Sequence, residues 1–284
     1  MIFLKEFSLP SKDSEQLFFE NQRMTCYNNN YPFQIFPDKV SKPFTFDPLT
    51  IFYGSNGSGK TTLLNVMADA LGAGRKAPYN RSAFFESYIS ICNFNAVVPR
   101  RCSFIASDDV FNRLLTLRDY NQKIDAEREA LQNEHRKIND SNFHFTMRSL
   151  SDCDELKKVN DAHKKTLSSF VNDKVAKNIK GHSNGESAFD FFVNELTDNG
   201  LYFLDEPENS LSAERQNELC DYIENCTRFF NCQIVMATHS PFMLAAKGAK
   251  IYDLDKNPIS VSDWTKLENV RAYYDFFQAH SDEF

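Results

Sequence analysis

Long apolar runs are missing from this 284-residue sequence, and none approaches the roughly 18 residues that a membrane-spanning helix requires. The N-terminal stretch MIFLKEFSLPSKDSEQ also lacks the basic segment and the extended apolar segment of a secretory signal peptide. The seven cysteines form no Cys-X-X-Cys pair and are odd in number, which argues against a disulfide framework and against a zinc site. We therefore expect a cytoplasmic protein with reduced thiols and no membrane partner.

Basic charge is scarce as well. The 32 Lys and Arg residues are outnumbered by 39 Asp and Glu residues, which gives a net charge of −7. Proteins that coat nucleic acid non-specifically usually carry a basic face, so this balance disfavours that class. Local cations at Arg100, Arg101 and within residues 157–180 still leave nucleic-acid contact open. Their interleaving with acids equally fits a solvated helix face.

The sequence pattern predicts an α/β fold. Apolar strands are expected at residues 49–53, 103–107, 201–205, 233–240 and 250–255, and helical patterns lie between most of them. Strands that alternate with helices form a largely parallel sheet covered on both faces. Aromatic runs at residues 2–7, 31–36 and 43–46 predict further, N-terminal strands. The 27 Phe residues are expected mainly in the core.

Residues 119–180 differ from the rest because they are polar and contain neither Pro nor Gly. A helix is expected over 119–140. Leu117, Ile124, Leu131 and Ile138 recur every seven residues, but the companion heptad positions are mostly polar. Such a thin stripe favours a helix that docks on a neighbour over a coiled coil.

A glycine-rich turn follows the strand at 49–53 and reads GSNGSGKT, which matches GxxxxGK[ST] at every fixed position. Glycines let backbone N–H groups surround phosphates, and the N-terminus of the following helix favours the same anion. Lys60 is expected to reach the β- and γ-phosphates of ATP, and the hydroxyl of Thr61 to bind Mg²⁺. The expected ATP-binding residues are Gly54, Ser55, Asn56, Gly57, Ser58, Gly59, Lys60, Thr61 and Thr62.

Two further strand ends carry polar groups. LYFLDEP places Asp205 and Glu206 at the end of an apolar strand, and strand ends of a parallel sheet converge on the ligand crevice. Asp205 is expected to hold Mg²⁺, and Glu206 to act on the attacking water as a general base. A Glu that caps the next helix is the alternative. QIVMATHSP presents His239 at a third strand end, either to contact the γ-phosphate or as an ordinary structural His.

In this order the motifs resemble those of ABC-type ATPases, over about residues 35–255. The resemblance identifies residues 183–187, SNGES, with the family signature, although alone this stretch would be a turn before a helix start. It implies that Ser183, Gly185 and Glu186 bind the ATP of a second copy in a head-to-tail homodimer. A helix near Ser187 would add its dipole.

The resemblance also implies a fold and a division of the chain. We expect a P-loop NTPase with an ABC-type sheet core, antiparallel N-terminal strands and a helical signature lobe. The corresponding boundaries are 1–107 for the N-terminal strands and phosphate-loop half, 108–187 for the lobe, and 188–284 for the remaining half of the core. Lys60, Glu206 and His239 would be catalytic, with ATP and Mg²⁺ as cofactors.

The sequences DEPEN and THSP are similar to those of the SMC and RecF group rather than to transporter subunits. Within that group, the chain resembles a subgroup of small ATPases found beside bacterial defence and genome-maintenance genes. Two positions depart from the pattern. The strand end at 107–109 offers no Gln, so Asp108 is either a metal ligand or, like Ser107, a helix N-cap. Tyr31 and Phe33 are candidates for adenine contact, and strand packing is the alternative.

The leading functional hypothesis is an ATP-hydrolysing switch that dimerises on ATP. It would control an effector protein or a nucleic-acid process such as DNA repair or anti-phage defence. An ATP-gated binding module with negligible turnover is the first alternative. A transporter nucleotide-binding subunit is the second, and the missing Gln counts against it.

Overall fold

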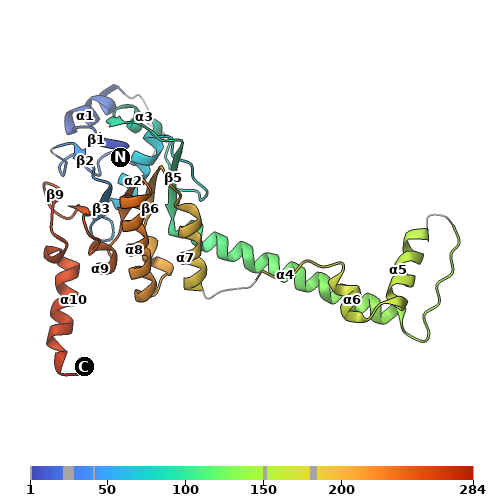
Figure 1. Ribbon diagram of the computed structural model, residues 1–284. Coiled ribbons are helices and arrows are strands. Elements are labelled where there is room, and N and C mark those ends of the chain that lie inside the picture. The colour runs from blue at the N-terminus through green and yellow to red at the C-terminus, as the bar shows by residue number, and fades with distance from the viewer. Residues whose placement is uncertain (1, 22–28, 41, 150–151, 180–183, 284) are drawn as a thin grey trace. The chain divides into compact units, whose positions relative to one another are not determined.

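The computed structural model describes residues 2–21, 29–40, 42–149, 152–179 and 184–283. The larger of the two sheets in these ranges has six strands in the order β5-β6-β7-β3-β8-β9 (Figure 1). The first five strands run parallel, and β9 pairs antiparallel with β8. The predicted parallel α/β fold is therefore confirmed. The strands are β3 (Leu49–Tyr53), β5 (Arg101–Ala106), β6 (Gly200–Asp205), β7 (Gln233–Ala237), β8 (Lys250–Asp253) and β9 (Ser260–Val261).

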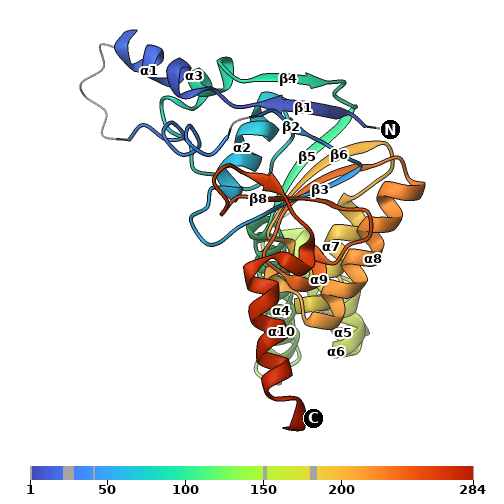
Figure 2. The same cartoon turned by 90° about the vertical axis from the view of Figure 1, so that its left-hand side faces the viewer.

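Helices cover both faces of this sheet. Figure 2 shows α2 between the sheet and the N-terminal strands, with α7 and α8 on the opposite side. Within the described ranges, no helix is long and apolar enough to cross a membrane. The helices outside the N-terminal region are α2 (Lys60–Ala70), α4 (Ser107–Ile138), α5 (Cys153–Lys164), α6 (Leu167–Asn172), α7 (Asn184–Glu195), α8 (Ala213–Phe229), α9 (Pro241–Leu244) and α10 (Glu268–Ala279), with short 3₁₀ turns η2 (Pro207–Ser210), η3 (Trp264–Lys266) and η4 (Ser281–Glu283).

A smaller antiparallel sheet in the order β2-β1-β4 lies beside the first. Buried side chains join the two sheets, and Gln233 makes the most such hydrogen bonds to β1. Gln233, the first residue of β7, accepts hydrogen bonds from the backbone N–H groups of Phe3 and Leu4 at 2.8 and 2.7 Å, and its amide donates to the Leu4 carbonyl at 2.8 Å. A buried amide with these bonds satisfied fixes how the sheets meet. The strands are β1 (Leu4–Ser8), β2 (Phe44–Thr45) and β4 (Asn93–Ala96).

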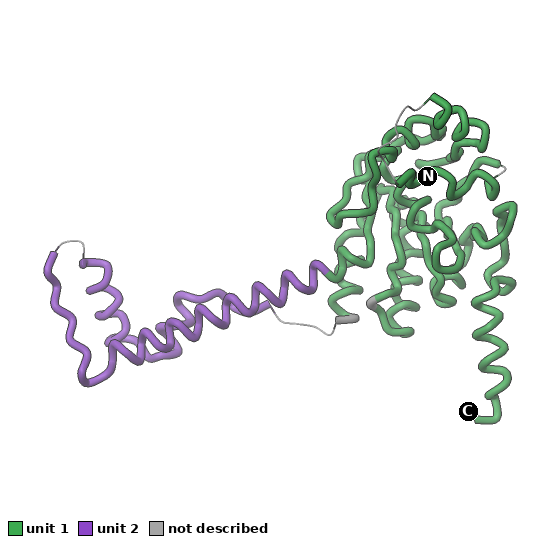
Figure 3. Tube along the Cα trace, turned by 180° about the vertical axis from the view of Figure 1, so that it is seen from behind, with its two compact units in different colours: residues 1–111, 183–284 green, residues 112–182 purple. Residues whose placement is uncertain are grey.

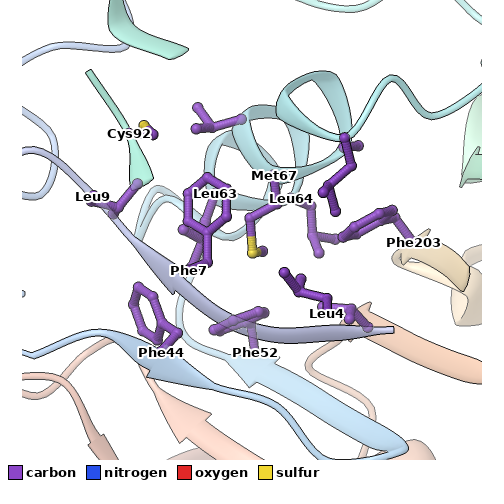
Figure 4. Close-up of a cluster of buried hydrophobic side chains, with 14 of the residues drawn as sticks. Leu4, Phe7, Leu9, Phe44, Phe52, Leu63, Leu64, Met67, Cys92 and Phe203 are labelled. Atoms are coloured by element: carbon purple, nitrogen blue, oxygen red, sulfur yellow. The ribbon is translucent and has the colours of Figure 1, made fainter. Parts of the chain in front are cut away.

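Helix α2 is buried more completely than its sequence predicts. The apolar spacing indicates one packed face, but all residues from Leu63 to Ala68 are buried. The reason is its position among side chains of both sheets, with Leu4 and Phe7 from β1 and Phe203 from β6 in the same core (Figure 4). A helix that is buried all round is held rigidly by packing. Its N-terminus, where the phosphate loop ends, is therefore fixed in place.

The N-terminal region contains one strand fewer than expected. Residues 31–36 form turns instead of a strand, because Phe33 and Phe36 both point into the core from an irregular segment. Helix α1 (Lys12–Asn21), which was not expected from the sequence, packs against this segment. Phe18 of α1 stacks on Phe33 with ring centroids 4.6 Å apart. Helix α3 (Phe85–Ser90) packs on the same cluster through Tyr88.

The chain divides into two compact units, residues 1–111 with 183–284, and residues 112–182 (Figure 3). The second unit is helical and has a core of its own. Ile124 and Ile138 of α4 are buried in that core, and Leu131 packs against it. At Ile124, Leu131 and Ile138 the seven-residue stripe is thus the docking face of a helix, as predicted, whereas Leu117 is not part of this core. Its partners on the returning segments are Val159, Ala162, Phe170, Val171 and Val175.

A helix cap in this unit allows a local test of its stability. Thr166 precedes α6, and its hydroxyl oxygen accepts a hydrogen bond from the backbone N–H of Ser169 at 3.3 Å. Thr166→Ala is expected to destabilise the helical unit by about 1 kcal/mol because that N–H loses its partner. Amide hydrogen exchange in α6 measures the loss. Thr166→Ser keeps the oxygen and should retain the parent's protection, and equal exchange in all three proteins would contradict the assigned cap.

Candidate active site

The polar residues singled out in the sequence follow the carboxyl ends of neighbouring parallel strands. Asp205 is the last residue of β6 and pairs in register with Ala237, the last residue of β7. Ala237 pairs in turn with Phe52 of β3. These three strand ends therefore meet at one edge of the sheet, as expected for a ligand crevice in a parallel sheet. The phosphate loop follows the end of β3 at this edge, and His239 lies shortly after the end of β7.

The backbone of the phosphate loop leaves no room for side chains at two of its glycines. Gly59 has φ 103°, a left-handed conformation, and a Cβ there would lie 2.8 Å from the Phe36 ring. At Gly54 a Cβ would lie 2.4 Å from the Ser58 hydroxyl oxygen. Both distances are too short for real contacts, so the loop requires glycine at these positions. The result is a turn whose N–H groups and helix N-terminus can face an anion.

Lys60 occupies the centre of this loop. Its side chain is only 5% exposed, and Nζ donates to the carbonyls of Gly54 at 2.8 Å and Ser55 at 3.2 Å. Glu206 Oε1 lies 3.9 Å from the same nitrogen. The ammonium is thus held inside the loop, where phosphate oxygens would replace the carbonyls as its partners.

Thr61 and Asp205 face each other across the same region. The Thr61 hydroxyl donates to Asp205 Oδ1 at 3.1 Å. Burial raises the pKa of Asp205 to about 6, in spite of this hydrogen bond and of the nearby Lys60. A hydroxyl and a partly desolvated carboxylate form the hard oxygen donor set that Mg²⁺ prefers, so these residues fit the metal expected here.

Glu206 has an uncommon backbone conformation. Its φ and ψ are 47° and 56°, in the left-handed region that costs a non-glycine residue roughly 1–3 kcal/mol. Its N–H donates to the Ala237 carbonyl at 2.9 Å, and its Oε2 accepts from the Asn209 amide at 3.0 Å. The side chain makes no cap to η2, so this geometry favours a general base over a helix cap.

His239 lies close to two of the three acids of the DEPEN sequence. Its Nδ1 lies 3.8 Å from Glu206 Oε1 and 3.5 Å from Glu208 Oε1. The ring also lines a cavity of about 470 Å³ together with Gly54, Ser55 and Asn56 of the phosphate loop. His239 therefore joins the phosphate loop to the acids, and this arrangement favours its role at a phosphate over a purely structural one.

The signature residues are described only in part. Ser183 lies outside the described residues, and α7 begins at Asn184, so it contains Gly185. The helix thus starts three residues earlier than the expected Ser187. Glu186 Oε1 lies 3.6 Å from the Arg215 guanidinium of α8. Their role toward a second copy stays a prediction.

Asp108 lies beside the metal donors but is not a helix cap. It lines a cavity of about 430 Å³ that Thr61 and Asp205 also line. The first turn of α4 is capped by its neighbour, because Asp109 Oδ2 accepts from the Ala106 N–H at 2.8 Å. Within the described ranges, no group of three or more His, Cys, Asp or Glu side chains is arranged to hold a metal ion. Metal binding by Asp108 therefore stays a prediction.

The two aromatic candidates for adenine contact differ in their surroundings, and adenine contact stays a prediction for Tyr31, which lines the same cavity as Thr61 and Asp205. Phe33 is 4% exposed and packs in the core, which agrees with the packing alternative although the segment is not a strand. The Tyr31 hydroxyl donates to Thr62 Oγ1 at 3.2 Å, and its ring stacks on Phe85. Thr62 of the phosphate-loop sequence is thereby tied to the N-terminal region.

Several residues that shape the site were given no individual role from the sequence. Glu208 contacts His239, and Asn209 contacts Glu206. Asp255 accepts hydrogen bonds from the N–H and hydroxyl of Ser55 at 2.7 and 2.8 Å. Asp255 follows β8, so the rule about strand ends could have found it. Asn269 of α10 donates to the His239 carbonyl at 2.8 Å, and no local signal in the sequence marks it.

The chain matches the AAA domain family over residues 33–227. No curated protein matches it. Among solved structures, it is similar to the Smc head domain with an extended coiled coil, bound to the C-terminal domain of ScpA, from Pyrococcus furiosus (12% identity, TM-score 0.43, 99% of this chain and 100% of that chain). It is also similar to a nucleotide-free ATP-binding cassette from an ABC transporter (12% identity, TM-score 0.43, 97% and 96%).

The family match spans well over half of the chain and includes both the phosphate loop and the acidic strand end of β6. This protein therefore belongs to the AAA domain family.

Proposed function

We propose that this protein is an ATP-hydrolysing molecular switch. One observation carries the proposal. The carboxylate of Glu206 lies within 3.9 Å of the Lys60 ammonium and 3.8 Å of His239 Nδ1, where the phosphate loop meets the ends of β6 and β7. A base, a cation and an imidazole gathered beside a phosphate-binding turn match the requirements of phosphoryl transfer to water.

In the proposed reaction, a water molecule attacks the γ-phosphorus of ATP. The new P–O bond forms as the bond between the γ-phosphorus and the β–γ bridging oxygen breaks, which releases ADP and phosphate. Glu206 accepts the proton of the attacking water, and Lys60 offsets the charge that accumulates on the β- and γ-phosphate oxygens. Mg²⁺, held by Thr61 and Asp205, would supply further neutralisation of phosphate charge.

We further propose that ATP closes a head-to-tail homodimer. The motif resemblance supports a contact of Ser183 and Gly185 with the ATP of the second copy. The cavity beside Gly54, Ser55 and Asn56 is consistent with this, since it leaves one side of the phosphate loop open. Two such contacts in one dimer would make its assembly depend on ATP, because neither copy alone completes a site.

The output of the switch is proposed to be control of an effector protein or of a nucleic-acid process, such as DNA repair or anti-phage defence. The similarity of the DEPEN and THSP sequences to the SMC and RecF group supports this choice over a transporter subunit. Hydrolysis would then end the dimeric state and reset the switch.

The test compares mass and turnover in the same preparation. Sedimentation with Mg²⁺ and a non-hydrolysable ATP analogue should show a species of twice 32.8 kDa, and the same sample with EDTA should show the monomer. A parallel sample of the same preparation, given Mg²⁺ and ATP in place of the analogue, should release phosphate. A monomer at saturating analogue would contradict the dimeric switch. Dimerisation with kcat below about 10⁻³ s⁻¹ would favour an ATP-gated binding module instead.

A further inference from the structure

Glu208 is a buried acid that the proposed hydrolysis does not use. Its side chain is 5% exposed, and its Oε1 accepts from the Thr238 hydroxyl at 2.6 Å and from the His239 backbone N–H at 3.1 Å. Its Oε2 is buried, and no described residue makes a hydrogen bond to it. Burial of a carboxylate costs free energy unless partners compensate its charge. The burial of Glu208 therefore calls for a functional or structural explanation.

The ring of His239 lies beside this carboxylate. Nδ1 of this ring is buried and has no hydrogen-bond partner among the described residues, and Glu208 Oε1 is 3.5 Å away. The side chain as a whole is 43% exposed, so the other edge of the ring, with Nε2, faces outward. That ring lines the cavity shared with Ser55 and Asn56 of the phosphate loop.

A second contact holds the same loop from the side of α10. The Asn269 amide donates to the His239 carbonyl at 2.8 Å, and the Asn269 N–H donates to the Tyr53 hydroxyl at 3.0 Å. The backbone of His239 is thereby fixed at both its N–H and its carbonyl. Of the two residues that bond to the His239 backbone, Glu208 and Asn269, Glu208 also lies beside the ring.

We propose that Glu208 is a positioning residue that sets the orientation and tautomer of His239. A carboxylate oxygen only accepts hydrogen bonds, so Glu208 favours a proton on Nδ1 and turns Nε2 toward the terminal phosphate. Glu208 itself does not touch ATP. This inference rests on the proposed function, because it assigns His239 to the phosphate.

The kinetic test is a double-mutant cycle. Glu208→Gln keeps an acceptor for Thr238 and for the His239 N–H but removes the charge beside the ring. It is expected to lower kcat about tenfold, with KM for ATP changed less than about twofold. In the His239→Ala background the same substitution should change kcat by less than about twofold, because the residue through which Glu208 acts is gone.

A matched control separates this effect from a general change of charge. Glu214 lies in the exposed first turn of α8, and Glu214→Gln should leave kcat and KM at the parent values. A tenfold loss from Glu208→Gln in both the parent and the His239→Ala background would overturn the inference. Such additivity means that Glu208 only supports the local fold.

A second readout does not depend on turnover. Long-range ¹H–¹⁵N NMR of the nucleotide-free protein, with His239 assigned by its absence in His239→Ala, reports which ring nitrogen carries the proton. The parent should show the Nδ1–H tautomer, and Glu208→Gln should shift the population toward Nε2–H. An unchanged tautomer would overturn the inference. If the parent hydrolyses no ATP, the proposed function fails and the tautomer alone decides the role of Glu208.

Discussion

Glu206→Gln is expected to reduce the kcat for ATP hydrolysis by about 10²–10³-fold while ATP still binds. Gln has nearly the same shape and can still accept from the Asn209 amide, so the side chain should stay where Glu206 lies. It cannot accept the proton of the attacking water. The loss should therefore appear in kcat and not in KM for ATP, as measured by steady-state phosphate release.

The same substitution should lengthen the life of the ATP-bound dimer. With hydrolysis blocked, Glu206→Gln in Mg²⁺ and ATP should sediment at twice 32.8 kDa, where the parent returns to monomer as ATP is consumed. Glu214→Gln makes the same change of charge on the surface of α8 and should behave as the parent does. Parental turnover in Glu206→Gln would refute the assigned base, and a monomeric Glu206→Gln protein with ATP would refute the dimeric switch.

The sequence allowed much of the site to be predicted because one physical rule applies to it. Carboxyl ends of parallel strands meet at one edge, and β6, β7 and β3 are all short, apolar and easily recognised. Asp205, Glu206 and His239 follow directly from their ends. The phosphate loop needs even less context, because its glycines and Lys60 form a nearly complete local motif.

Other features could not be predicted because they depend on tertiary contacts. The left-handed backbone of Glu206 is not marked by a Gly or Asn, although the carboxylate of this residue lies 3.9 Å from Lys60 Nζ. Glu208 looks like any charged residue in a turn until β7 is placed beside it. Asn269 lies 30 residues from the carbonyl that it holds. Similarly, α2 appears one-sided in sequence because the small sheet that covers its second face is assembled from distant segments.

Asp205 leads to the second large effect, which concerns stability without metal. Burial raises the pKa of its carboxyl to about 6, from 3.8 in an exposed chain. The folded protein therefore holds a proton more tightly than the unfolded chain does, and its stability falls as the pH rises from about 3.8 to 6. Above pH 6 the ionised carboxylate costs the folded state at most about 3 kcal/mol.

Asp205→Asn should remove this cost, so in EDTA at pH 7.5 the variant should be more stable than the parent by about 2–3 kcal/mol. At pH 5 the difference should shrink to about half, because the parent's carboxyl is then mostly protonated when folded. Urea unfolding at both pH values measures it. Addition of Mg²⁺ and an ATP analogue should stabilise the parent more than the variant, which keeps the phosphate loop but lacks the negative charge that attracts the cation. A variant that is less stable than the parent in EDTA at pH 7.5 would show that the carboxylate is held by favourable contacts. In that case Asp205 would serve the fold more than the metal. The expected opposite result has a general physical cause: a site that desolvates an anion in advance gives up stability in the empty protein and regains it when the cation binds.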